Sequence, residues 1–524
     1  MAINQRKAGT MLSYVQLVLS TVIGLCYTPI MLNILGQGEY GLFGTASSLT
    51  SFLSLLSFGV SGSYMKFVME YRVTKDKHGE NKLNGMFLII YSVFSLLVIV
   101  VGSILIFCSD SIFANSLSSN ELYEVKWIMF FTIINYVFSF ISTPIMMCIL
   151  SFERYFFIRI LAIALNLINP IINIVLLSVY PYAVTISVIT TAISVLTMII
   201  YWLYAYKKLD MRFEFKNFSF TRVKSVFIFS SFLLINEITN QIVNSTDRLV
   251  LSVVSGTVAV AIYQVASNFS GYFSSFSSSV SGVFAPSINK IVALSKAEGT
   301  NPDAELNKLF VKIGRIQFLI LTLAIVGFSC LGRQFVLLWA GPEYEYSFWI
   351  ALILLLTPYI PFIQNTGLEI QKAKNKHKVR SVVYLCVGIV NAGLTIPITC
   401  WFLNNGFGPG VGGIVAASVT LVSVLLGQVV FMNIYYQKKI GVNVINFWKN
   451  IIRMLPGVLI PFALGLIITN IWFADNYLIF AIQVLIIIVL YGGSVWLLSM
   501  NEYEKNLVKG PIKKIIGKFK RKKG

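Results

Sequence analysis

The sequence predicts an all-α polytopic membrane protein with 14 transmembrane helices, and three observations support this fold class. The 524 residues are 56% hydrophobic and only 12% charged, with a mean hydropathy of +0.78. Fourteen apolar segments are each long enough to cross the roughly 30 Å of hydrocarbon in a bilayer. If they cross alternately, 38 of the 41 Lys and Arg residues fall on one side. Because such a bias marks the cytoplasmic side, both termini are predicted to be cytoplasmic.

The 14 segments are predicted to be helices, because each is a continuous apolar run and the strands of membrane barrels alternate. The first follows Arg6 and Lys7 but is too long for the apolar part of a signal peptide, and no small-residue cleavage site follows it. It therefore counts as a span. The segments lie at 10–35, 39–66, 84–108, 126–150, 156–179, 183–206, 225–255, 257–286, 313–339, 347–371, 380–403, 411–436, 451–473 and 476–500.

An internal repeat predicts how these helices are organised. Residues 36–62, moved by 220 positions, match residues 256–282 at eight of 27 pairs and share the ending Val-Ser-Gly. The shift carries the second segment onto the eighth, so the repeat unit has six helices and two parallel repeats are expected. The predicted domains are a six-helix bundle at 1–206, a second at 207–436, two further helices at 437–500 and a basic cytoplasmic tail at 501–524. The tail alternates lysines with apolar residues, which predicts a helix on an anionic inner leaflet.

Composition and motifs exclude several classes of function. The net charge of +20 is spread over every inside loop, so no nucleic-acid partner is expected. The six cysteines and two histidines form no metal-ligand pattern, and no phosphate-binding loop or catalytic signature occurs. We therefore expect no metal, no cofactor and no enzyme activity.

Polar residues at membrane depth gather in segment 225–255. A charge at the centre of a spanning helix costs about 2.5–3.5 kcal/mol on insertion scales and rarely persists without a role. At 100° per residue, six polar side chains fall in one arc of about 120°. Lipid does not solvate such a face, so it lines a wet cavity or packs against partners. An ion pair of Asp247 or Glu237 with Arg248 that only fixes packing is the alternative. The polar residues of the segment are Asn236, which lies outside the arc, and the six within it: Glu237, Asn240, Gln241, Asn244, Asp247 and Arg248.

Three short stretches carry a family resemblance. Residues 35–43 read Leu-Gly-Gln-Gly-Glu-Tyr-Gly-Leu-Phe, followed by Ser-Ser-Leu at 47–49 and Phe-Gly-Val at 58–60. This resembles the opening of the bacterial polysaccharide flippases of the Wzx type. Their superfamily also holds the peptidoglycan lipid flippase and the multidrug and toxin extruders, and the likeness in segment number, repeat and length covers the whole chain. Phe58 stands where relatives often have an acidic residue, so no role is carried over to it.

The resemblance implies an activity and a site. It implies alternating-access transport of polyprenyl-diphosphate-linked oligosaccharide from the inner to the outer leaflet of the bacterial cytoplasmic membrane, together with other polysaccharide assembly proteins. Glu237 and Asp247 are the predicted ion-coupling residues for a Na⁺ or H⁺ gradient. Lys66 joins the site only if the cavity reaches the inner end of the second segment. The predicted substrate-binding residues are Arg248, Asn244, Gln241, Asn240, Asn268 and Gln264.

Other functions make different predictions. A cation-coupled multidrug extruder of the same superfamily predicts an acidic cavity and usually 12 helices; Glu237 and Asp247 favour it, whereas Arg248 and the last two segments oppose it. A polysaccharide polymerase predicts a long catalytic outside loop, which this sequence lacks. A structural scaffold leaves the polar face of segment 225–255 unexplained.

Overall fold

The structure is a computed structural model that describes residues 5–57, 59–215, 220–374, 376 and 378–510; at a few helical positions, residue 244 among them, it describes the backbone only. Every element in this part of the chain is a helix. Internal contacts group the chain into two compact units. The first unit comprises Met1–Gln264 and Val387–Ala416, and the second comprises Val265–Cys386 and Ala417–Gly524. The predicted division into two six-helix repeats stays a prediction, because these units follow contacts rather than repeats.

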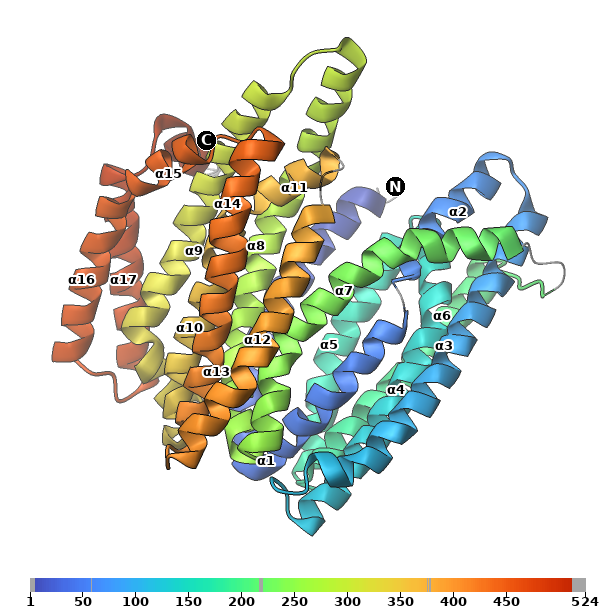
Figure 1. Cartoon of the computed structure of the whole chain (residues 1–524), viewed down its shortest axis with the longest axis horizontal. Helices are drawn as coiled ribbons and strands as arrows, with labels where there is room; N and C mark the ends of the chain where they lie inside the picture. The colour runs from blue at the N-terminus through green and yellow to red at the C-terminus, as the bar shows by residue number, and fades with distance from the viewer. Residues whose placement is uncertain (1–4, 58, 216–219, 375, 377, 511–524) are drawn as a thin grey trace, which may run out of the picture. The chain divides into compact units, whose positions relative to one another are not determined.

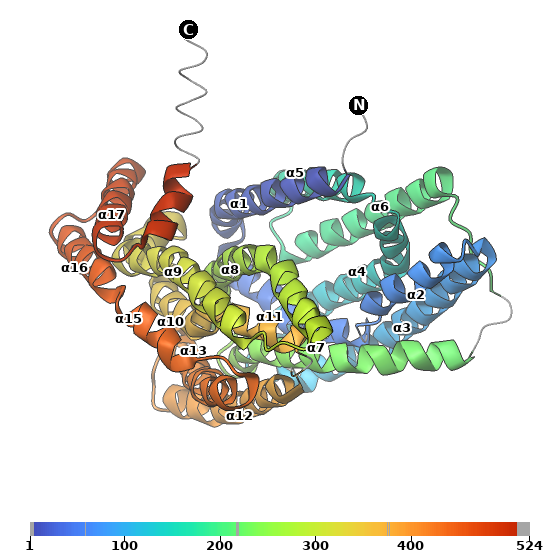
Figure 2. The same ribbon diagram turned by 90° about the horizontal axis from the view of Figure 1, so that it is seen from above.

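The first unit holds the helices of the N-terminal half. Within it α4 lies between α3 and α6, and α1 packs along α5 (Figures 1 and 2). Aromatic side chains fill its core, and the buried Tyr64 hydroxyl donates to Asn84 Oδ1 at 2.6 Å. The elements are α1 (Gln5–Thr50), the 3₁₀ helix η1 (Ser51–Ser57), α2 (Ser61–Val73), α3 (Lys77–Ile112), α4 (Ser119–Ser151), α5 (Tyr155–Leu177), α6 (Ala183–Leu209) and α7 (Phe220–Val254).

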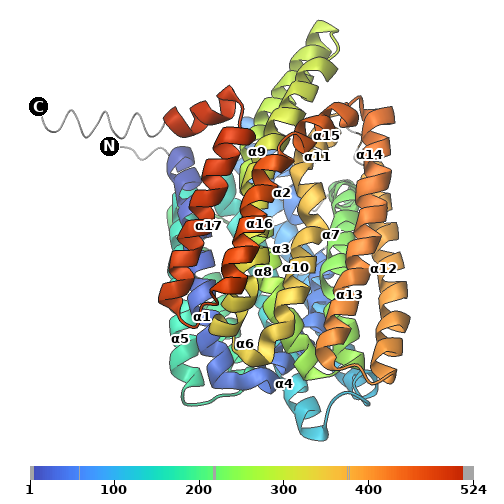
Figure 3. The same ribbon diagram turned by 90° about the vertical axis from the view of Figure 1, so that its left-hand side faces the viewer.

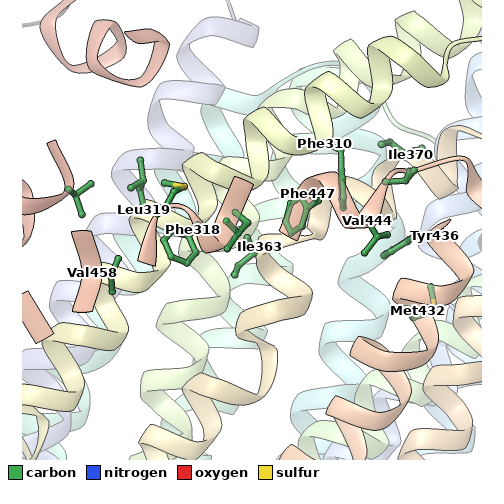
Figure 4. Packing of buried hydrophobic residues seen from close by; sticks show 14 of the residues in the cluster. Phe310, Phe318, Leu319, Ile363, Ile370, Met432, Tyr436, Val444, Phe447 and Val458 are labelled. Carbon is green, nitrogen blue, oxygen red and sulfur yellow. The ribbon is translucent and has the colours of Figure 1, made fainter. Parts of the chain in front are cut away.

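Three helices cross the division between the units: α8 (Thr257–Glu298), α12 (Lys378–Asn404) and α13 (Pro409–Val424). In the second unit α9 packs against both α16 and α17 (Figure 3). Figure 4 shows its core, where the Phe310 and Phe447 rings lie 4.5 Å apart between centroids. The other elements are α9 (Asp303–Trp339), the 3₁₀ helix η2 (Pro342–Tyr344), α10 (Glu345–Ile363), α11 (Asn365–Ala373), the π-helices η3 (Leu425–Phe431) and η4 (Tyr436–Ile440), α14 (Met432–Tyr435), α15 (Val444–Ile452), α16 (Leu455–Ile471) and α17 (Tyr477–Leu498).

Length and composition make this a multi-pass membrane protein. Among the described residues, ten helices are long and apolar enough to cross a membrane, or 11 if the pair α15 and α16, bent by 43°, counts as one span. The predicted count of 14 is not confirmed. The helices α7 and α8, of 35 and 42 residues, have spanning length but are not among the ten. Residues 11–73 are counted as one of the ten spanning helices, although they hold two of the predicted segments.

The second predicted segment, 39–66, is not one continuous helix. The first helix turns sharply at Gly36, where φ is +71°, and continues to Thr50; η1 and α2 follow. Ser48, Ser51 and Ser54 each donate a hydroxyl hydrogen bond to the carbonyl three residues earlier. Such local bonds compete with the α-helical pattern and accompany the change to a 3₁₀ helix. Segment 347–371 is likewise broken, between α10 and α11 at Gln364.

Candidate functional site

The helix α7 carries the predicted polar face, and exposure changes along it. Glu237 and Asn240 are exposed, whereas Gln241 is half-buried. Further along, Asp247 is only 1% exposed and Arg248 is half-buried. A carboxylate hidden to this degree inside a membrane helix requires hydrogen-bond donors around it, because an unpaired buried charge is strongly unfavourable.

Asp247 has its donors on two neighbouring helices of the first unit. The Tyr263 hydroxyl of α8 donates to Asp247 Oδ2 at 2.6 Å, and Asn391 Nδ2 of α12 donates to Oδ1 at 3.4 Å. Thr395, one turn beyond Asn391, donates to Asn391 Oδ1 at 3.2 Å. The side chains of Tyr263, Asn391 and Thr395 are themselves buried. The carboxylate therefore links α7, α8 and α12 through a polar network that carries one negative charge.

Arg248, the next residue, has a different partner. Its Nη1 donates to Gln264 Oε1 at 2.7 Å. Its Nε is buried and has no hydrogen-bond partner among the described residues. A guanidinium presents five N–H donors in a rigid fork that matches the oxygens of a phosphate. Nε is enclosed in this structure, so an anionic ligand would reach it only after the side chain moves.

Gln241 connects α7 to the 3₁₀ helix η1. Its Nε2 donates to Ser51 Oγ at 2.6 Å and to Ser245 Oγ at 2.7 Å, and the Ser51 hydroxyl lies 3.3 Å from that of Ser245. The amide nitrogen of Gln241 is therefore used inside the protein. These bonds fix the position of η1 against the middle of α7.

The structure brings together only part of the predicted site. Arg248, Gln264 and Asp247 lie close to one another in the first unit, while Glu237 and Asn240 are exposed nearer the beginning of α7. Asn268 belongs to the second unit, where it is half-buried. The side chain of Asn244 lies outside the part of the chain that the structure describes, as does Phe58.

Sequence reasoning missed two members of the Asp247 network, Asn391 and Thr395. Both lie in the predicted segment 380–403, spaced by four residues and therefore on one helix face. An asparagine and a threonine at that spacing inside a spanning helix are the signal that identifies them. Tyr263 precedes the predicted residue Gln264 in the sequence, but its hydrogen bond to Asp247 depends on the packing of α7 against α8.

The comparison with known protein families assigns the chain. A family described as polysaccharide biosynthesis protein matches residues 7–292, which is more than half of the sequence. The chain belongs to this family. No curated protein matches it. Membership of the polysaccharide biosynthesis protein family confirms the resemblance found in residues 35–60.

Solved structures confirm the fold. The lipid II flippase MurJ, in an inward closed conformation, is 17% identical with a TM-score of 0.66, and the alignment covers 95% of this chain and 99% of that one. An inward-facing multidrug resistance transporter of the MATE family, in the MOP superfamily, is 14% identical with a TM-score of 0.58 and coverage of 80% and 96%. The Vibrio cholerae MATE transporter VcmN is 10% identical with a TM-score of 0.53 and coverage of 84% and 100%.

Proposed function

We propose that this protein is a flippase that moves a polyprenyl-diphosphate-linked oligosaccharide from the cytoplasmic to the outer leaflet of a bacterial cytoplasmic membrane by alternating access. The observation that carries the proposal is Arg248, a guanidinium in a membrane helix with a buried N–H that has no partner among the described residues. In a polysaccharide biosynthesis protein, the membrane-embedded anion of the expected class is a lipid diphosphate.

The chemistry of Arg248 fits this anion. Charge-assisted hydrogen bonds from an arginine fork to phosphate oxygens are roughly twice as strong as neutral ones, and their strength increases where water is excluded. Gln264 holds Nη1 at 2.7 Å and orients the fork. Hydroxyl groups of the sugars require amide and hydroxyl partners, and the predicted residues Asn240, Asn244 and Asn268 are of that type. The predicted residue Gln241 can offer only its amide oxygen, because its nitrogen donates to Ser51 and Ser245.

Asp247 is the proposed site for the ion whose gradient drives transport. Its carboxylate, the Asn391 amide and the Thr395 hydroxyl offer oxygens suited to Na⁺, and the carboxylate alone accepts H⁺. Tyr263 and Asn391 both donate to this carboxylate, so a bound cation competes with them for its oxygens. Ion binding is thereby coupled to the packing of α7, α8 and α12. Glu237 remains a second predicted coupling residue, on the exposed part of α7.

The test uses the purified full-length protein in liposomes and follows leaflet exchange of a diphosphate-linked oligosaccharide lipid, with and without a Na⁺ or H⁺ gradient. Arg248→Gln is expected to lower the exchange rate at least tenfold, because it removes a charge-assisted contact that contributes about 1.5–3 kcal/mol. Arg333→Gln is the matched control, because Arg333 forms an exposed ion pair with Glu345 at 2.7 Å. Normal exchange by Arg248→Gln would remove this residue from the site.

The same liposomes test the second candidate function, a cation-coupled extruder. Its support is the MATE fold together with the acidic residues Glu237 and Asp247. Ethidium efflux without lipid exchange would identify an extruder and refute the flippase. Lipid exchange without efflux is the expected result.

A further inference from the structure

A groove lies within the second unit, and none of its lining residues belongs to the α7 site. It has a volume of about 580 Å³ and lies where the first turns of α9 meet α15 and the residues that follow α17. Its lining includes Lys308, Lys312 and Arg315, and also asparagines from α9, from α15 and from position 501. None of the residues lining the groove is acidic.

Arg315 forms part of the wall rather than a free cation. It is 8% exposed and binds the Glu504 carboxylate through two hydrogen bonds, at 2.6 and 2.8 Å. The carbonyl oxygens of Ser499 and Asn450 accept its remaining donations, at 2.9 and 3.4 Å. Because Glu504 neutralises it and its donors are engaged, Arg315 fixes the shape of the groove and adds no net charge.

The opposite wall is α15, a short amphipathic helix. Its apolar side is buried, with Phe447 packed against Phe310 of α9 (Figure 4). Asn446 and Asn450 lie on the groove side, and Asn450 Nδ2 donates to the Asn446 carbonyl at 2.8 Å. Both walls are therefore fixed by packing and hydrogen bonds, so the groove is formed without a ligand.

Two lysines give the groove its charge. Lys308 and Lys312 lie one turn apart on α9, so their ammonium groups repel each other. Neither forms an ion pair with any residue that the structure describes. The Lys312 ammonium lies 3.8 Å from the centroid of the Tyr503 ring, which holds it at the edge of the groove. The groove thus carries about two unneutralised positive charges. Of the asparagine amides beside them, those of Asn307 and Asn450 already donate to protein oxygens, which leaves Asn446 and Asn501 to meet a ligand.

The sequence of α9 places the groove at the level of lipid headgroups. Arg315 is the last charged residue before Arg333, and the uncharged stretch between them, residues 316–332, spans about 25 Å. Hydrocarbon therefore begins just beyond Arg315. Tyr503 lines the groove, and Tyr is enriched at the membrane interface. The charge bias assigns this side to the cytoplasmic leaflet.

We propose that the groove binds the phosphate-bearing headgroup of an anionic phospholipid in the cytoplasmic leaflet. A phosphate diester with an adjacent hydroxylated group matches two lysines flanked by asparagine amides. Basic pockets between helices on the cytoplasmic side are suited to such headgroups. The bound lipid bridges α9, α15 and the helical residues 502–510. This inference is independent of the cargo.

The experiment measures binding of phosphatidylglycerol and phosphatidylcholine to the purified full-length protein by native mass spectrometry. Lys308→Gln with Lys312→Gln is expected to weaken phosphatidylglycerol binding about 30-fold, since each lysine near an anionic headgroup contributes roughly a fivefold factor. Phosphatidylcholine binding is expected to stay the same. Lys207→Gln with Lys208→Gln, in the exposed last turn of α6, is the control with the same loss of charge. If the double variant does not fold, Lys308→Gln alone serves as the test, because the Lys308 side chain is exposed. It is expected to weaken phosphatidylglycerol binding roughly fivefold.

Each other outcome overturns the proposal. Equal weakening in the Lys207 and Lys208 variant would mean that binding follows overall charge and not the groove. Unchanged phosphatidylglycerol binding in the Lys308 and Lys312 variant would place the lipid elsewhere. Glycerol phosphate or inorganic phosphate that competes as well as the lipid would identify a soluble ligand. Preferential loss of an added polyprenyl diphosphate, with phosphatidylglycerol unaffected, would assign the groove to cargo.

Discussion

At the residue scale, Asp247 and Arg248 are neighbours in the chain with opposite charges and different surroundings. Asp247 is almost wholly buried and accepts from Tyr263 and Asn391, whereas Arg248 is half-buried and donates to Gln264. The hydrogen bonds of the two charges thus run to different partners, on both α8 and α12. If Asp247 and Arg248 served only as an ion pair within α7, the two side chains would not each require separate hydrogen-bond partners on α8 and α12. This arrangement favours two roles, one for a cation and one for an anion.

We expect Asp247→Asn to abolish the response of lipid exchange to a Na⁺ or H⁺ gradient, because the variant keeps the shape of the side chain but not its charge. The measurement is exchange in liposomes with and without the gradient. Tyr263→Phe is the control: it removes the 2.6 Å hydrogen bond and keeps the carboxylate, so the gradient response should persist. A full response by Asp247→Asn would make the residue a packing element only.

At the element scale, glycines determine how the kinked first helix meets α8. Gly36 and Gly256, which the repeat pairs, have φ values of +71° and +76°, a conformation that glycine adopts readily. Five residues after the kink, a Cβ on Gly41 would lie 2.1 Å from the Thr257 carbonyl oxygen. The backbone of α1 therefore approaches the beginning of the helix that carries Tyr263 and Gln264.

Gly41→Ala is expected to lower the free energy of unfolding by about 1–3 kcal/mol, because the added methyl group must displace backbone. Gly38→Ala provides the comparison, since its Cβ would meet nothing within 4 Å. There the better helix propensity of alanine should raise stability by up to about 1 kcal/mol. Thermal unfolding in detergent measures both, and equal stability of the two variants would contradict the close approach.

The buried pair of Arg315 and Glu504 ties the chain's last described helical residues to α9. Asn501 and Glu504 also cap this helix reciprocally, at 2.9 Å in each direction. Glu504→Gln should destabilise the protein by about 3–5 kcal/mol, because it leaves a buried guanidinium without its counter-charge. The exposed Glu502 offers a matched control, and Glu502→Gln should change the unfolding temperature little.

Much of the helical pattern is predictable from hydropathy, whereas the breaks within helices are not. Apolar runs identify α3, α4, α6 and α17 directly, because lipid-facing helices must be continuous and apolar. The change to a 3₁₀ helix after Thr50 depends on serine hydroxyls that bond locally, which hydropathy does not register. The polar face of α7 was predictable from the sequence. The spacing of Asn391 and Thr395 marks them as one helix face, but their link to Asp247 depends on packing between helices distant in sequence.

At the scale of the whole molecule, the positive residues predict orientation. With 38 of 41 on one side of the predicted 14 segments, the predicted topology tolerates the loss of any single loop charge. Reporters fused to the two termini should therefore both be active in the cytoplasm and inactive outside it. Reporters on opposite sides would require an odd number of crossings and would exclude 14. Replacing Lys372 and Lys374 together should leave this result unchanged, because the other inside loops keep their charge.

The contact between Arg315 and Glu504 also sets an order for biosynthesis. The two residues lie 189 positions apart, so at about 5–20 residues per second Arg315 is made on the order of 10–40 s before its partner. During that interval the second unit contains an arginine whose counter-charge does not yet exist. A ribosome that stalls or terminates before residue 504 leaves this arginine unmatched at the membrane surface, so the neutralisation of Arg315 depends on residues that are made long after α9.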